Sequence, residues 1–338
     1  MKIIFRADGS NHTGIGHIFR LIALAGLLKD DFECVFATTN TDDFILQQVK
    51  TVCSSVIHLP EGKKKAVPDS HEVEETGFDL GGHLSGNEIV VLDGYWFGTV
   101  YQEEIKKYGS RIVSVDDLAS QYFLSDVVIN HAPAIDPSVY KTASYTKLCL
   151  GLDYSILRKP FFSPLKTKDN AHPSVYISLG GTDYYGMSAA IVRKFLAKKM
   201  FHKVHVLASN SFAPSLLAEL DTMAVVNAEL SIHKNMSAEQ ICGLLDICTH
   251  AFVSASTVLF ECYSRGVKCF TGYNIINQKM IYDGFTGAGL CTGVGDLHAT
   301  TADNITDTVE NGLADLTNVL HEPLHSHDHL RKMFASLC

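Results

Sequence analysis

Residues 6–28 read Arg6-Ala-Asp-Gly-Ser-Asn-His-Thr-Gly-Ile-Gly-His-Ile-Phe-Arg-Leu-Ile-Ala-Leu-Ala-Gly-Leu-Leu28, directly after a short apolar strand, Ile3–Phe5. Apolar residues recur at positions 18, 21, 22, 25 and 28. This is the spacing of one helical face, so we predict an amphipathic helix that begins near His17. A strand joined to a helix by a short glycine-containing loop is the repeating unit of parallel α/β sheets.

The strand–loop–helix pattern recurs along the whole chain. Strands are predicted at 3–5, 34–37, 56–59, 89–92, 112–115, 127–129, 175–178, 203–207, 251–253 and 268–271. Helices are predicted at 42–49, 101–107, 188–199, 237–246 and 257–265, with two polar helices in the tail after residue 301. Repetition of this unit predicts an α/β fold in which parallel sheets carry helices on both faces.

The length of 338 residues suits two domains. A stretch rich in proline and charge, Leu157–Pro173, precedes a fresh strand and marks the boundary. We therefore expect domains at 1–160 and 161–338, the second including the helical tail.

Composition excludes several classes of protein. The net charge of -9 argues against nucleic-acid or anionic-membrane partners, which need basic surfaces. The nine cysteines form no Cys-x-x-Cys pair, so we expect reduced, buried thiols. Arg6 and Asp8 interrupt any leader-like apolar segment, and no apolar run approaches the ~18 residues of a membrane span. These features predict a cytoplasmic protein.

His17 is the first candidate for chemistry. The positive end of a helix disfavours a protonated imidazole, so His17 is expected to be neutral and able to accept a proton. Gly14 and Gly16 let the loop backbone approach an anion with its N–H groups. A proton acceptor beside an anion site suggests a nucleotide-sugar site. The alternative without a function is a tight turn that carries a surface histidine. The spacing is not the Gly-x-Gly-x-x-Gly fingerprint of a dinucleotide-binding oxidoreductase.

Two further acidic sites follow strands of the first half. Asp93 ends the strand at 89–92, where it could orient His17 or bind a sugar hydroxyl, and Tyr95 could bind or cover a sugar. The alternative is a turn acid with packing aromatics. Asp116 and Asp117 repeat the strand-to-acid arrangement, and we expect them to cap the next helix.

In the second half, Gly180 and Gly181 follow a strand and could offer amides to a phosphate. Ser256 and Thr257 are predicted to open a helix, where hydroxyl and N–H groups together suit a pyrophosphate. Glu261 lies one turn further along that helix and could accept hydrogen bonds from a ribose. The alternative is an N-capped helix with a solvated glutamate.

Taken together, these segments resemble the UDP-sugar hydrolases of the pseudaminic acid pathway, relatives of the MurG-type GT-B glycosyltransferases. The matching pieces follow the family order and lie at 6–25, 91–97, 113–120, 148–161, 178–183, 254–261 and 274–278. The resemblance implies an α/β GT-B fold, with two Rossmann-like domains and a cleft between them. It places the catalytic base and the sugar on the first domain and the nucleotide on the second.

The resemblance also implies roles for individual residues. His17 would activate water, and Tyr95 would lie near the sugar. Ser256 and Thr257 would hold the diphosphate and Glu261 the ribose. The sugar and phosphate would be bound by Asn277 and Gln278. The chain departs from the family at Gly94, where a histidine is usual, at the additional His12, and in a longer C-terminal part.

The implied reaction is removal of UDP from UDP-2,4-diacetamido-2,4,6-trideoxy-β-L-altropyranose, which releases the free sugar. We expect no metal, because no His-x-His or Asp-x-Asp arrangement has convincing metal spacing, and no other cofactor. The expected partner is a small nucleotide sugar, and the expected state is a monomer or weak dimer. A glycosyltransferase with the same donor site and a non-catalytic nucleotide-sugar-binding protein remain alternatives.

Overall fold

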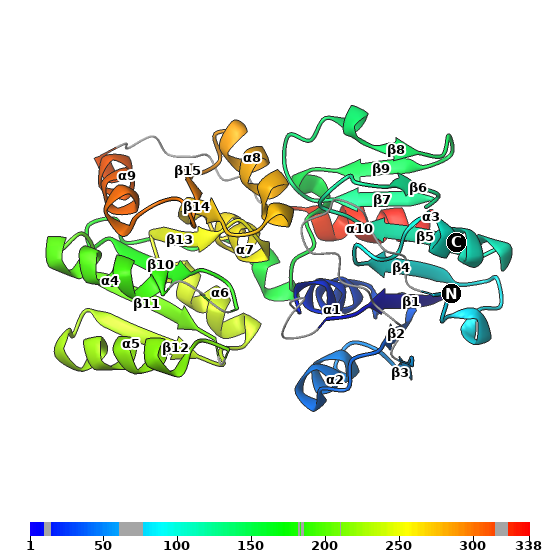
Figure 1. Ribbon diagram of the computed structural model, residues 1–338, viewed down its shortest axis with the longest axis horizontal. Coiled ribbons are helices and arrows are strands. Elements are labelled where there is room, and N and C mark those ends of the chain that lie inside the picture. Colours follow the sequence, from blue (N-terminus) through cyan, green and yellow to red (C-terminus); the bar gives the residue numbers. More distant parts are fainter. Residues whose placement is uncertain (10–14, 61–76, 182, 184–185, 210, 315–323) are drawn as a thin grey trace. The chain divides into compact units, whose positions relative to one another are not determined.

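The computed structural model describes residues 1–9, 15–60, 77–181, 183, 186–209, 211–314 and 324–338 (Figure 1). Two compact units divide the chain: unit 1 consists of Met1–Lys159 with His325–Cys338, and unit 2 of Pro160–Leu324. Each unit is built around its own parallel sheet. The predicted α/β class is therefore confirmed, with two Rossmann-like domains.

Unit 1 contains a seven-stranded sheet in the order β3-β2-β1-β4-β5-β7-β9, in which every neighbouring pair is parallel. Its strands are β1 (Lys2–Ala7), β2 (Glu33–Thr38), β3 (Ser55–His58), β4 (Ile89–Asp93), β5 (Arg111–Val115), β7 (Val127–Asn130) and β9 (Lys147–Leu150). A separate parallel pair is formed by β6 (Tyr122–Phe123) and β8 (Lys141–Thr142). The helices of the unit are α1 (Gly16–Leu28), α2 (Asp43–Lys50), α3 (Thr99–Lys107) and α10 (Ser326–Ala335).

Unit 2 contains a six-stranded parallel sheet in the order β12-β11-β10-β13-β14-β15. Its strands are β10 (Ser174–Ser178), β11 (Lys203–Ala208), β12 (Leu230–Lys234), β13 (His250–Ser254), β14 (Lys268–Tyr273) and β15 (Thr292–Asp296). Its helices are α4 (Met187–Lys198), α5 (Pro214–Val226), α6 (Ala238–Ile247), α7 (Thr257–Ser264), α8 (Lys279–Gly287) and α9 (Ala302–Ala314).

Short 3-10 turns occur in both units and lie at Gly81–His83, Pro137–Val139, Leu152–Tyr154, Lys159–Phe162 and Ile276–Gln278.

Both sheets reverse their strand order at one point. In unit 1 the order turns between β1 and β4, and in unit 2 between β10 and β13. Ligands of open α/β sheets bind beyond the carboxyl ends of the strands at such a switch point. The central strands are buried on both faces, which explains their nearly continuous apolar sequences. The switch points thus indicate where each unit can carry polar groups.

The tail differs from its expected place. It forms two helices as predicted, but α10 belongs to unit 1, whereas we expected the whole tail in the second domain. Leu330, Met333 and Phe334 of α10 are buried, and the Phe334 ring lies 6.4 Å from that of Phe32. An apolar helix face is stable only when another element covers it, and α10 finds its cover on unit 1.

Several elements had no sequence prediction, among them β9, β12, β15, α5 and α8. Strand β15 reads Thr-Gly-Val-Gly-Asp, and two glycines remove the apolar pattern that marks a strand. Helix α5 buries only Leu216 and Leu220, so its periodicity is weak.

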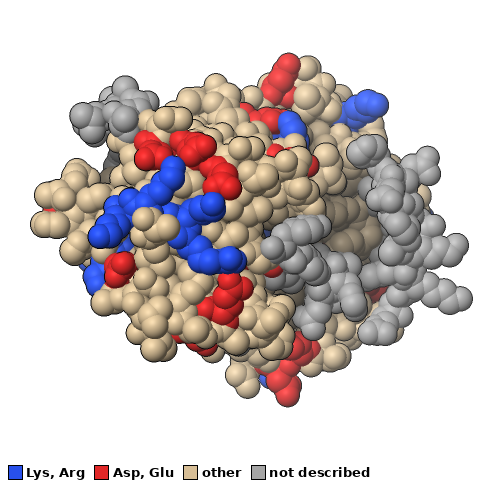
Figure 2. Space-filling model, turned by 60° about the vertical axis from the view of Figure 1, so that its left-hand side comes forward, with Lys and Arg blue, Asp and Glu red and all other residues tan. Residues whose placement is uncertain are grey.

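Charges on the surface of unit 2 are arranged in pairs. Figure 2 shows lysine and arginine side chains with acidic side chains directly beside them on the face that this view brings forward. Lys194 and Lys198 of α4 contact Asp303, Asp307 and Glu310 of α9. These two lysines of α4 are therefore matched by acidic residues of α9.

Candidate functional site

Helix α1 places His17 at the switch point of unit 1. The helix begins at Gly16, as predicted, so His17 lies in its first turn. Gly14 and the loop amides at 10–14 lie outside the described residues, and their predicted part in anion binding stays a prediction. His17 is 7% exposed. It is therefore not a surface histidine on a tight turn, which was the alternative interpretation.

Asp93 is the nearest polar partner of His17. It is the last residue of β4 and pairs in register with Ala7 of β1, whose chain continues toward α1. His17 Nδ1 lies 2.7 Å from Asp93 Oδ1. When Nδ1 carries the hydrogen and donates it to this carboxylate, Nε2 is left as a proton acceptor. The structure thus brings His17 and Asp93 into direct contact, which is the contact that the sequence position of Asp93 suggested.

Arg20 also binds the carboxylate of Asp93. Its Nε donates to Asp93 Oδ2 and its NH2 group to Asp93 Oδ1, both at 2.7 Å. Burial by itself would raise the pKa of Asp93, but the charges of Arg20 and His17 outweigh it and lower that pKa to about 2. Asp93 is therefore ionised at neutral pH although it is fully buried.

Sequence reasoning did not assign Arg20 to the site. The available signal was a single charged residue, three positions after His17, in a helix whose other residues are almost all apolar. Its burial could not be predicted, because the acids that pair with it lie 73 and 97 residues away.

The interpretation of Asp116 and Asp117 as helix caps is wrong. No helix follows them; a loop leads from β5 to the short strand β6. Asp116 Oδ2 instead accepts hydrogen bonds from the N–H groups of Leu118 and Ala119 and from the Tyr140 hydroxyl. Asp117 Oδ2 accepts a hydrogen bond from Arg20 NH1 at 3.1 Å.

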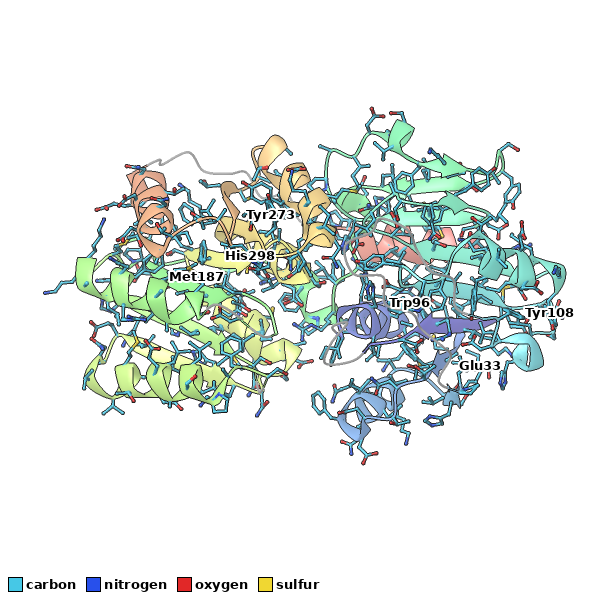
Figure 3. All side chains as sticks on the ribbon, in the orientation of Figure 1. Glu33, Trp96, Tyr108, Met187, Tyr273 and His298 are labelled. Atoms are coloured by element: carbon cyan, nitrogen blue, oxygen red, sulfur yellow. The ribbon has the colours of Figure 1, made fainter. Side chains whose placement is uncertain are left out.

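Two aromatic rings lie beside the His17 imidazole. The Tyr95 and Trp96 rings lie 4.8 and 5.7 Å from the His17 ring, and both meet it edge to face. Figure 3 labels Trp96, which is half-buried. Tyr95 is also half-buried, so both residues remain partly exposed to solvent. An aromatic surface next to a base is suited to the C–H face of a sugar.

The candidates of unit 2 gather at the carboxyl edge of three adjacent strands, β10, β13 and β14. Gly180 follows β10 with a φ of +93°, a conformation that favours glycine. A Cβ at Gly180 would lie 3.8 Å from Ser254 Oγ, so the two loops are close. Gly181 is next in the chain and is exposed. The structure therefore brings Gly180 near the Ser254–Thr257 loop.

Helix α7 begins at Thr257, with Ser256 as its extended N-cap residue. The Ser256 side chain does not cap the helix; its Oγ lies 3.2 Å from Ser254 Oγ. Glu261 is buried. The alternative interpretation, an N-capped helix with a solvated glutamate, therefore does not describe this site. The first N–H groups of an eight-residue helix and two adjacent hydroxyls thus lie at the switch point of unit 2.

Asn277 and Gln278 occupy the turn between β14 and α8. Gln278 Oε1 accepts a hydrogen bond from the Asn274 N–H group at 2.8 Å, which closes this turn. Asn277 is half-buried. Both lie beyond the strand next to β13, at the same edge of the sheet as Ser256.

Among the described residues, no group of three or more His, Cys, Asp or Glu side chains is placed to hold a metal ion. None of the described helices combines the length and apolar character needed to cross a membrane.

Comparison with known proteins supports the fold and one functional direction. No family model matches the chain. The chain is 24% identical over 266 residues to the UDP-2,4-diacetamido-2,4,6-trideoxy-beta-L-altropyranose hydrolase of Campylobacter jejuni, covering 77% of this chain and 87% of that protein. It is 21% identical over 305 residues to an uncharacterized protein of Methanocaldococcus jannaschii, covering 84% of this chain but only 58% of that protein.

Solved structures of glycosyltransferases share this fold. The chain resembles MurG of Acinetobacter baumannii with a TM-score of 0.63 and 13% identity, covering 99% of each chain. It resembles an Arabidopsis thaliana glycosyltransferase complexed with quercetin with a TM-score of 0.65 and 9% identity, covering 100% of this chain and 99% of the other. The fold is therefore that of the GT-B glycosyltransferases, with two Rossmann-like domains, and the chain is similar in sequence to a UDP-sugar hydrolase.

Proposed function

We propose that this protein is an enzyme that hydrolyses a UDP-activated acetamido sugar and releases the free sugar and UDP. The observation that carries the proposal is the 2.7 Å contact between His17 Nδ1 and Asp93 Oδ1, which leaves Nε2 available as a base. The similarity to the Campylobacter jejuni hydrolase points to the same reaction class and to a sugar of nonulosonic (pseudaminic) acid biosynthesis.

In the proposed reaction, His17 Nε2 takes a proton from water. The water oxygen forms a bond to the anomeric carbon as the bond from that carbon to the phosphate oxygen breaks. The bonding electron pair leaves with UDP. Asp93 orients the imidazole and stabilises its protonated form. Tyr95 and Trp96 contact the sugar.

We propose that unit 2 holds the nucleotide. The α7 N–H groups, together with Ser256 and Thr257, bind the diphosphate and stabilise the charge that develops on UDP. Glu261 accepts hydrogen bonds from the ribose hydroxyls. Gly180, Gly181 and the turn with Asn277 and Gln278 complete the site. These groups meet at one edge of the sheet, which supports a common ligand.

The first test is incubation of the enzyme with a panel of nucleotide sugars without any acceptor, followed by mass spectrometry. We expect release of UDP and free sugar from an acetamido-deoxy sugar nucleotide. His17→Ala should lower kcat by about 10²–10⁴-fold while UDP affinity stays within about twofold, because His17 acts as a base and not as a nucleotide ligand. His83→Ala is the control, since His83 is an exposed histidine of the same unit. Full activity of His17→Ala would remove this residue from the mechanism.

A second candidate is a glycosyltransferase, which the fold of the solved neighbours favours. It would use the same donor and base, with an acceptor hydroxyl in place of water. Turnover only after an acceptor is added would favour it over the hydrolase. UDP binding without turnover of any sugar nucleotide would instead favour a non-catalytic binding protein.

A further inference from the structure

Arg20 binds two buried carboxylates. One of them, Asp93, contacts His17 directly, and the other, Asp117, is linked to His17 through Arg20. Asp93 contacts both His17 and Arg20. Asp117, on the loop after β5, reaches the same cluster through Arg20 NH1 at 3.1 Å. Each of these four residues is at most 7% exposed. The cluster is thus a small buried set of charges beside the candidate base.

The charges of the cluster do not cancel while His17 is neutral. One positive charge on Arg20 faces two negative charges on Asp93 and Asp117, so one net negative charge remains. When His17 takes up a proton, the net charge of the cluster becomes zero. An uncompensated buried charge is costly, so the cluster favours the protonated imidazole that water activation creates.

Among the described residues, four other titratable groups near the cluster come from four different loops. They are Tyr95 after β4, Asp116 after β5, His131 after β7 and Tyr140 before β8. Burial and the Arg20 charge lower the pKa of His131 to about 3, so His131 adds no charge at neutral pH. Burial and the Asp117 charge raise the pKa of Asp116 to about 6, so above that pH Asp116 adds a further negative charge. With these neighbours included, the net charge around a neutral His17 remains negative.

We propose that Asp117 is a positioning residue that acts through Arg20 and supplies the counter-charge for protonated His17. The inference rests on the proposed function, in which His17 is the base. Without Asp117, the Arg20–Asp93 pair would be neutral, and the positive charge of protonated His17 would have no counter-charge within the cluster. Asp117 therefore strengthens a base that it reaches only through another side chain.

The test is Asp117→Asn, which keeps the size and an oxygen acceptor for Arg20 but removes the charge. We expect the midpoint of the His17 imidazole titration, followed by NMR and assigned with His17→Gln, to move to lower pH by about one unit. The acid limb of the kcat/KM profile should move in the same direction. We expect kcat to fall about tenfold with KM little changed, because a weaker base acts only in the chemical step. An unshifted midpoint would overturn the proposal.

Three further variants separate charge from packing. Asp117→Glu keeps the charge and should retain the wild-type midpoint; a shift as large as that of Asp117→Asn would contradict the proposal. Asp117→Ser is a smaller neutral variant for the case that the amide prevents folding, and the same shift is expected. Glu88→Gln is the matched control: Glu88 is a buried acid of unit 1 that binds Lys2 and Ser85 and precedes β4 at the opposite end of the strand from Asp93. The Glu88→Gln protein should be less stable than the wild type, and the midpoint of its His17 titration should not move.

The NMR titration needs no substrate. If no sugar nucleotide is turned over but the His17 midpoint still shifts in Asp117→Asn, the proposed function fails and the electrostatic inference stands. If turnover depends on His17 and the midpoint does not shift, the proposed function stands and the electrostatic inference fails.

Discussion

Gly94 has a backbone φ of +154°, and Trp96 takes the space beside it. A Cβ at position 94 would lie 2.8 Å from two atoms of the Trp96 ring and 3.1 Å from Phe97. This chain therefore has, at a position where the resemblance implies a histidine, a glycine that makes room for an indole. The indole ring is one of the two that meet His17 edge to face.

Gly94→Ala should displace the Trp96 ring. Trp96 is the sole tryptophan of the chain, so its fluorescence reports this site directly. We expect a shift of its emission maximum and a loss of roughly tenfold or more in kcat/KM, because small displacements of groups around a base are costly. Gly109→Ala is the control: Gly109 also has a positive φ, of +86°, in unit 1, so the change should cost stability and leave the emission unchanged. Identical spectra for Gly94→Ala and wild type would contradict this expectation.

Asp116 makes stability depend on pH. Burial and the charge of Asp117 raise its pKa from 3.8 to about 6. Between these values the native state binds more protons than the unfolded state, so stability falls as pH rises from about 4 to 6. Asp116→Asn lacks this titration, and all three bonds to Asp116 Oδ2 can pass to the amide oxygen.

We therefore expect the unfolding free energy of wild type to fall by about 3 kcal/mol relative to Asp116→Asn between pH 3.5 and 7. Urea unfolding of both proteins at several pH values measures this difference. Parallel pH profiles would show that Asp116 does not titrate in this range in the folded protein.

At the scale of elements, α1 carries His17, the proposed base, and α10 packs against the same unit. Ser326 Oγ at the start of α10 donates to the Ser155 carbonyl at 2.7 Å, and Arg331 forms an ion pair with Asp31 at 2.7 Å. The apolar face of α10 contributes the fully buried Leu330 and Phe334. The C-terminal helix is thus part of the core of unit 1.

Phe334→Ala should destabilise unit 1 by about 3–5 kcal/mol, because it removes a fully buried aromatic ring and leaves a cavity. Thermal unfolding followed by circular dichroism measures the loss. Arg331→Ala on the same helix should cost less than about 1 kcal/mol, since its ion pair is exposed. Equal effects of the two changes would mean that α10 is held by its charges and not by its apolar face.

At the scale of the whole molecule, the two units differ in how the chain builds them. Unit 2 is one continuous segment, 160–324, whereas unit 1 needs both ends of the chain. We expect residues 160–324 to unfold cooperatively as an isolated fragment and to bind UDP, whereas 1–159 should fold poorly unless 325–338 is joined to it. Calorimetry of the fragments and titration of the first with UDP test this. A stable 1–159 fragment would show that α10 is dispensable, and a folded 160–324 fragment without UDP affinity would count against the nucleotide site.

Much of this architecture could be predicted because it is local. The strands at the centre of each sheet are short apolar runs followed by helical periodicity, as in Ile3–Phe5 and the helix after it, so the α/β class and most central elements follow from pattern alone. Elements at the margins, such as β12 and β15, carry few apolar residues and lacked that signal. The position of His17 at a helix start was local too, and it was confirmed.

The sequence by itself determined which side chains stand where parallel strands end: His17, Asp93, Ser256 and Glu261 follow from strand and helix patterns in their own neighbourhoods. Only the tertiary structure decided which of them meet. Because β4 lies beside β1 and β5 beside β4, Asp93 and Asp117 converge on Arg20 from positions 73 and 97 residues away. Strand order depends on how whole sheets bury their apolar faces, and no local pattern records it. The same reason placed α10 on unit 1, where an apolar surface remained to be covered.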